Sequence, residues 1–198
     1  MCPMRLREVL RLVRTGDPTQ LFRRYFVNTL FDSTFVVLGI LAASAFARDP
    51  NIDLALGAMF GACLAIGIST GVSVYEAEHT EGEIRLRRLE RAMLTRLRET
   101  EVGLRIEAIR FATALVNFLA PLFVVSVTGA PIVLYRLGVL TDFIVAAGLS
   151  SAFGIGIIFG AGYYLGTLTG KRPWRKATRM TLVAILTLGA LVTLERLL

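Results

Sequence analysis

Residues 54–75 read LALGAMFGACLAIGISTGVSVY, a run of 22 positions without a charged side chain. A helix needs roughly 20 mainly apolar residues to cross the hydrocarbon core of a lipid bilayer. The run therefore predicts a membrane-spanning helix. Four further segments have the same apolar character, namely residues 25–47, 111–135, 143–169 and the shorter 180–194. The sequence thus predicts an all-α, polytopic membrane protein with five transmembrane helices.

The composition of the chain supports this class. Of its 198 residues, 55% are hydrophobic, and they are gathered in long blocks rather than dispersed as in a soluble domain. This pattern excludes both a soluble globular domain and a disordered chain. Cys2 and Cys63 lie far apart in the sequence, so no disulfide framework is expected.

The net charge of +7 is better explained by membrane topology than by a nucleic-acid partner. Residues 1–24, 76–110 and 170–179 carry 19 of the 22 Lys and Arg side chains, and the five spans place these segments on one side. Because cationic loops stay in the cytosol, we expect the N terminus inside and the C terminus outside. The expected location is the lipid bilayer of a prokaryotic cell membrane, with no nucleic acid among the partners.

The spans divide the chain into four predicted parts. These are an amphipathic cytosolic N-terminal helix (1–24), transmembrane helices 1 and 2 (25–75), a Glu/Arg-rich cytosolic helical segment (76–110) and transmembrane helices 3 to 5 (111–198). The second helix is expected to extend into the cytosol, since only Gly82 interrupts its helical pattern. Near residues 98–101 the pattern reverses, which predicts a turn and then a short helix from Glu101 to Arg110.

Asp32 is the only charged residue in the first span. It lies seven residues beyond Tyr25, about 10 Å inside the cytosolic end of the helix. A carboxylate in a span usually faces a bundle interior or water, and oxygen atoms from Asn28 and Ser33 lie near it in sequence. Hard cations prefer such oxygen ligands, which favours an ion path over the alternative, a structural Asp paired with an arginine or another helix.

A second candidate site follows the second span. At 100° per residue, four side chains share a stripe about 60° wide beside an apolar seam, which predicts that the stripe faces a partner helix. They are Glu76, His79, Glu83 and Glu90. The pair Glu76 and His79 has the one-turn spacing of two ligands on one metal ion, and imidazole with carboxylates suits divalent transition metals. Metal binding and ion pairing remain equally open for this stripe.

The opposite face of the same helix carries Glu78 and Glu81 together with Arg85 and Arg88. Their spacing predicts a solvated set of ion pairs one turn apart. No catalytic constellation is found, because the chain has one histidine, no CxxC pair and no phosphate-binding glycine loop. We therefore expect no catalytic residues, no enzymatic activity and no organic cofactor.

Glycines in the spans recur at helical spacing. The pairs Gly57/Gly61, Gly67/Gly71, Gly156/Gly160 and Gly162/Gly166 have the small-xxx-small pattern. Such pairs allow helix backbones to approach one another closely. The main interpretation is tight packing between helices.

The order of several segments resembles the vacuolar iron transporter family, over nearly the whole chain from Arg24. The first span opens with Asn28-Thr29-Leu30-Phe31-Asp32, and the second passes directly into a Glu-rich helix. The third span holds Ala114-Leu115-Val116-Asn117-Phe118-Leu119-Ala120-Pro121-Leu122, similar to the family's small-polar-then-proline pattern. The Gly-rich fourth span ends with Leu168-Thr169-Gly170-Lys171, followed by Trp174-Arg175.

The resemblance implies a homodimer in which Asp32 of each subunit faces an ion path, with Asn117 assigned to the same path. It also implies export of Fe(II) or Mn(II) from the cytosol as the transported substrate, in exchange for protons. The glutamates that would collect metal are Glu76, Glu83, Glu90 and Glu107. The chain departs from the family in its shorter cytosolic segment. It also departs at Ser69-Thr70-Gly71-Val72-Ser73, where the family has a methionine followed by Gly-Glu-Tyr.

The leading hypothesis is therefore a divalent-metal transporter. The first alternative is a membrane-anchored metal-sensing or scaffold protein that does not transport. A membrane enzyme acting on lipids is a third reading. The carboxylate inside a span favours transport, because a scaffold has no need of it.

Overall fold

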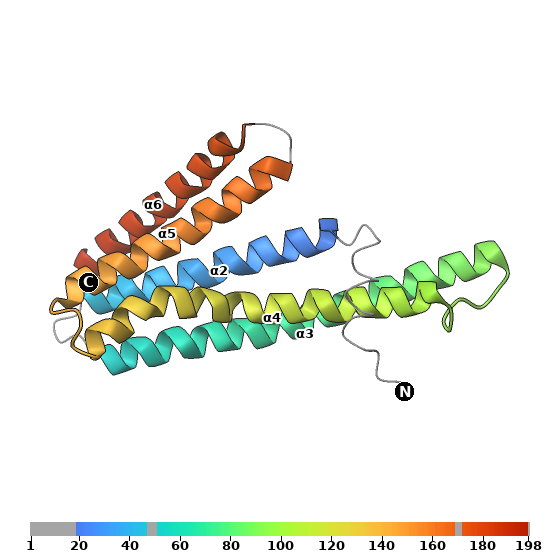
Figure 1. Ribbon diagram of the computed structural model, residues 1–198, viewed down its shortest axis with the longest axis horizontal. Coiled ribbons are helices and arrows are strands. Elements are labelled where there is room, and N and C mark those ends of the chain that lie inside the picture. Colours follow the sequence, from blue (N-terminus) through green and yellow to red (C-terminus); the bar gives the residue numbers. More distant parts are fainter. Residues whose placement is uncertain (1–18, 47–50, 169–171, 198) are drawn as a thin grey trace. The chain divides into compact units, whose positions relative to one another are not determined.

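The computed structural model describes residues 19–46, 51–168 and 172–197, and they form five helices (Figure 1). The helices are α2 (Thr19–Phe46), α3 (Ile52–Met93), α4 (Glu101–Arg136), α5 (Phe143–Leu168) and α6 (Pro173–Leu197). Each is long and apolar enough to cross a membrane, and the described residues contain no strand. The predicted all-α membrane architecture is confirmed. Of the predicted N-terminal helix, residues 1–18 lie outside the described part, and residues 19–24 belong to α2.

Local sequence explains where several helices begin and end. Asn51 precedes α3 and its Oδ1 accepts a hydrogen bond from the Leu54 amide at 3.0 Å. Asp142 caps α5 in the same way through the Ile144 amide, at 2.9 Å. These side chains satisfy amides that the first helical turn leaves without a partner. At its other end α3 stops at Leu94, which has a left-handed φ of 51°.

The structure differs from the sequence prediction in α4. Residues 101–110 and the third span are one continuous helix, not a short helix followed by a span. The reason is that residues 104–120 contain neither glycine nor proline, so nothing interrupts the helix before Pro121. Similarly, α3 continues for 18 residues beyond the apolar run that ends at Tyr75. That this extension lies in the cytosol stays a prediction.

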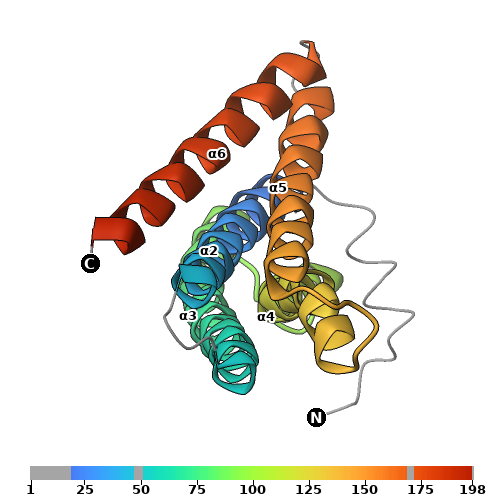
Figure 2. The ribbon, with the colours of Figure 1, turned by 90° about the vertical axis from the view of Figure 1, so that its left-hand side faces the viewer.

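The chain divides into two compact units, and the boundary crosses α2, α3 and α4. The first unit contains residues 67–119 together with residues 19–26 of α2. In it α3 and α4 run antiparallel and side by side (Figures 1 and 2). A Cβ added at Gly67 would lie 2.7 Å from the Phe118 carbonyl oxygen, and one at Gly82 would lie 2.7 Å from Ile106 Cγ2. Glycine is therefore required where these two helices approach most closely.

The second unit contains residues 27–66 and 120–198. Gly154 of α5 packs against Leu38 of α2, whose Cδ2 would lie 3.3 Å from an added Cβ. The pair Gly162/Gly166 faces α6, again at close range. By contrast, a Cβ added at any member of the pairs Gly57/Gly61 and Gly156/Gly160 would meet no described atom within 4 Å. Among the described residues, two of the four predicted glycine pairs, Gly67/Gly71 and Gly162/Gly166, therefore make close contacts.

Candidate functional site

The first candidate site lies on one face of α2. Asp32 and Asn28 are both exposed at the surface of the chain, one helical turn apart. Asn28 Nδ2 donates a hydrogen bond to Asp32 Oδ2 at 3.0 Å. Asn28 thus uses its amide nitrogen on the carboxylate, which leaves its amide oxygen as a ligand for a cation. The structure brings these two predicted residues together.

Two other predicted path residues do not share this face. Ser33 is fully buried, and its hydroxyl donates to the Thr29 and Leu30 carbonyls at 2.9 and 3.1 Å. Asn117 belongs to the other unit, where it is fully buried and its Nδ2 donates to the Thr113 carbonyl at 2.8 Å. Ser33 was predicted beside Asp32 because the two residues are adjacent in sequence. Adjacent residues of a helix point about 100° apart, so they lie on different faces.

The second candidate site is the hairpin of α3 and α4, where Arg110 is the central residue. Its guanidinium lies 4.6 Å from the centroid of the Tyr75 ring and also contacts His79 Nδ1. The Tyr75 and His79 rings are stacked, with centroids 6.4 Å apart. Arg110 further pairs with Glu107 at 3.3 Å, and its side chain is only 13% exposed. A buried guanidinium that meets an aromatic face, an imidazole and a carboxylate ties the two helices together.

This role of Arg110 was not predicted from the sequence. In the sequence, Arg110 is the last cationic residue before an apolar span. Such a position fits an arginine that reaches toward the membrane surface equally well as one that makes a specific contact within the protein. The contact with Arg110 affects the availability of His79 as a metal ligand. Because the Arg110 guanidinium already contacts His79 Nδ1, a metal ion at this nitrogen would have to displace Arg110.

The remaining members of the stripe are also engaged in the hairpin. Glu83 accepts from Arg98 at 2.7 Å and from Arg87 at 3.3 Å. Glu90 Oε1 accepts from the Leu97 amide at 2.8 Å, whereas Glu76 is exposed. Three of the four side chains therefore meet α4 or the turn before it, in agreement with the apolar seam beside them.

The metal site that the stripe predicts is not assembled in this structure. Within residues 19–46, 51–168 and 172–197, no group of three or more His, Cys, Asp or Glu side chains could hold a metal ion. Arginines occupy the carboxylates of Glu83 and Glu107. Metal binding here would require these ion pairs to open, and it stays a prediction.

The prediction of a solvated ion-pair face at Glu78 is wrong. Glu78 is 8% exposed, and its Oε1 is buried without a hydrogen-bond partner in the described part of the chain. No ion pair between described residues joins Glu78 or Glu81 to Arg85 or Arg88. Glu81, Arg85 and Arg88 are exposed, as predicted, so the helical-wheel assignment of an open face failed at Glu78, which the fold covers.

Polar chemistry is thus found in two places, one in each unit. The second unit has the exposed pair Asn28 and Asp32, and the first unit has the arginine-bridged hairpin. Comparisons of the chain with protein-family models, with curated proteins and with solved structures find no match.

Proposed function

We propose that the protein is a divalent transition-metal transporter, which moves Fe(II) or Mn(II) out of the cytosol in exchange for protons. The observation that carries this proposal is the exposed carboxylate of Asp32 on a helix long and apolar enough to span the membrane. A charged side chain at the centre of such a helix costs about 2.5–3.5 kcal/mol if it faces lipid alone. The Asp32 face therefore meets an ion, water or another protein surface.

A second copy of the chain is the partner that fits best. Asp32 and Asn28 offer one carboxylate and one amide oxygen, which are too few ligands for a divalent transition metal. A two-fold axis beside α2 would bring the same two residues from the other copy and double the number of ligands. We therefore propose a symmetric homodimer with the ion path along this face. Ser33 would support α2 beside the path, since its hydroxyl is bonded to a backbone carbonyl of the same helix. That Asn117 lines the path stays a prediction.

Proton exchange follows from the chemistry of the carboxylate. A metal ligand must be deprotonated, so metal and protons compete for Asp32. Metal arriving from the cytosol would displace the proton, and protons from the far side would later displace the metal. The same group thereby couples the two fluxes.

The proposed function is tested with the full chain in proteoliposomes that contain a pH indicator. Addition of Mn(II) or Fe(II) should produce metal uptake together with a pH change in the lumen, and protein-free vesicles should show neither. Absence of metal flux in vesicles that contain folded, monodisperse protein would contradict transport. It would favour the alternative, a membrane-anchored metal-sensing or scaffold protein, and the occupied carboxylates of the hairpin support the scaffold.

A separate prediction concerns metal binding by the hairpin. Arg98→Gln removes the guanidinium that lies 2.7 Å from Glu83 Oε1. If Glu83 is a metal ligand, loss of this competing cation should raise Mn(II) affinity about two- to fivefold, since an exposed ion pair is worth up to about 1 kcal/mol. Calorimetry on the detergent-solubilised chain measures the change.

The matched control is Arg88→Gln, which removes an exposed arginine of α3 that is in no ion pair with the described residues. An equal gain in both variants would indicate a general charge effect. Unchanged affinity in Arg98→Gln would remove Glu83 from the set of metal ligands.

A further inference from the structure

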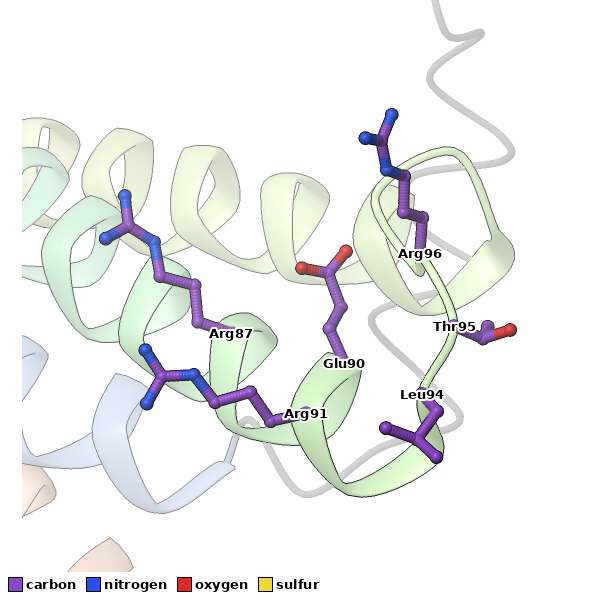
Figure 3. A pocket seen from close by; sticks show the side chains of 6 residues that line it. All are labelled: Arg87, Glu90, Arg91, Leu94, Thr95 and Arg96. Atoms are coloured by element: carbon purple, nitrogen blue, oxygen red, sulfur yellow. The ribbon is translucent and has the colours of Figure 1, made fainter.

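A pocket of about 310 Å³ lies at the end of the hairpin, where α3 turns into α4. It is lined by Arg87, Glu90, Arg91, Leu94, Thr95 and Arg96. Figure 3 shows that Arg87 and Arg91 extend from the last turns of α3, whereas Thr95 and Arg96 come from the connecting turn. None of these residues belongs to the Asp32 face, and the pocket lies entirely within the first unit.

The turn that forms one wall of this pocket is held by specific contacts. Leu97 is buried, with 7% of its surface exposed, and its amide donates to Glu90 Oε1 at 2.8 Å. The Thr100 hydroxyl donates to the Leu97 carbonyl at 2.6 Å. Arg98 reaches back across the turn to Glu83 at 2.7 Å. These contacts fix the backbone of the turn, which lowers the entropic cost of ordering it around a ligand.

The pocket carries uncompensated positive charge. It presents three guanidinium groups and a single carboxylate, Glu90, one of whose oxygens already accepts the Leu97 amide. Arg87 is shared with Glu83, but neither Arg91 nor Arg96 forms an ion pair with any described residue. The surrounding residues 85–98 hold six arginines against this one acidic side chain. The field in the pocket therefore attracts anions.

The side chains in this pocket match phosphate. Guanidinium groups bind phosphate oxygens through paired hydrogen bonds. Figure 3 shows the guanidinium groups of Arg91 and Arg96 extending in different directions, so a ligand that meets both must carry more than one phosphate group. The volume lies at the lower end of the range for small-ligand sites, about 300–1,000 Å³, and is too small for a folded partner. Leu94, which is 92% exposed at the rim, could cover an apolar portion of the ligand.

We propose that this pocket binds a small soluble polyphosphate, either inorganic or carried by a nucleoside, at the end of the α3–α4 hairpin. The ligand's phosphates contact Arg91 and Arg96, with Arg87 beside them. The proposal does not rest on transport, because the pocket shares no residue with the Asp32 face.

The experiment is calorimetric titration of the full chain, in nanodiscs of zwitterionic lipid, with pyrophosphate and with ADP. We expect both to bind, and the double variant R91Q/R96Q to weaken binding at least about tenfold through loss of two charge-assisted contacts. The matched control is R85Q/R88Q, which removes the same charge from exposed positions of α3 outside the pocket. It should change affinity less than about threefold, because these side chains add to the field around the pocket but do not line it and make no direct contact with the ligand. Leu94→Ser separates the two sources of phosphate. If the ligand carries a nucleoside, this variant should bind ADP more weakly and pyrophosphate with unchanged affinity. If the ligand is inorganic, the affinities for both should stay unchanged.

Two outcomes would overturn the proposal. One is failure of both ligands to bind a chain that is monodisperse in nanodiscs. The other is equal weakening by R91Q/R96Q and R85Q/R88Q, which would mean that anions associate with a diffuse basic surface. Circular dichroism of each variant checks that the hairpin remains helical, and a variant that lost helicity would be replaced by R91K/R96K. This variant keeps the charge but loses the paired geometry, so it should still weaken binding.

Discussion

Replacement of Asp32 by asparagine should reduce metal flux in proteoliposomes at least about tenfold, because the lost charged ligand is worth more than about 1.4 kcal/mol in a desolvated site. The substitution keeps the size of the side chain and the hydrogen-bonding position opposite Asn28 Nδ2. It removes the negative charge and the group that exchanges a proton for metal. Metal uptake and the accompanying change in luminal pH should therefore be lost together.

The matched control for this prediction is Asp53→Asn. Asp53 lies in the first turn of α3, where it pairs with Arg136 at 3.1 Å, and both side chains are well exposed. An exposed pair of this kind contributes little to stability, so the control should transport at close to the wild-type rate. Wild-type flux in Asp32→Asn would make Asp32 a structural polar group and contradict the exchange mechanism. Loss of metal flux with intact proton movement would contradict the coupling alone.

The largest expected effect on stability comes from Gly162→Leu, in the contact between α5 and α6. A Cβ at Gly162 would lie 2.9 Å from Ala177 Cα and 3.0 Å from Met180 Sδ. Backbone cannot move aside as a flexible side chain can, so we expect the free energy of unfolding to fall by about 3 kcal/mol, the upper end of the usual cost of overpacking. The two helices should separate locally.

Trp174 provides the measurement, since it is the only tryptophan and packs against Phe159 and Tyr163 with ring centroids 5.6 and 5.7 Å away. The near-UV circular dichroism of this aromatic cluster should weaken and lose its cooperative thermal transition in Gly162→Leu. The control is Gly160→Leu, two residues earlier, where an added Cβ meets no described atom within 4 Å. Equal spectra and equal melting of the two variants would contradict the close contact of α5 with α6.

The sequence was sufficient to predict the membrane-spanning helices but not the contacts between them. Apolar runs of about 20 residues predict membrane spans because a helix satisfies its backbone polar groups within one segment in lipid. The pair Asn28 and Asp32 was also predictable, since residues four apart lie on one helix face. Ser33 was misplaced because its nearness to Asp32 in sequence is not nearness on the helix surface.

Contacts between helices depend on register, which periodicity alone does not fix. The contact of Arg110 with His79 joins residues 31 positions apart, and one helical turn of sliding between α3 and α4 would break it. The register is set by close approaches such as Gly67 to Phe118 and Gly82 to Ile106, which become visible only once the helices are paired. The burial of Glu78 escaped prediction for the same reason.

The continuity of α3 has a mechanical consequence. From Gly67 to Met93 the helix runs for 27 residues without a proline, a length of about 40 Å at 1.5 Å per residue. Sharp bends in helices occur at a proline, a Gly/Ser pair, a bulge or an inserted group, and Gly71 and Ser73 lie near the start of this stretch, so the part beyond Ser73 behaves as a lever arm. A tilt of about 10° at Ser73 would displace Met93, about 30 Å further along the helix, by about 5 Å. Small rotations at the start of this arm would thus be amplified at the far end of the hairpin, where a pair of fluorophores could follow them.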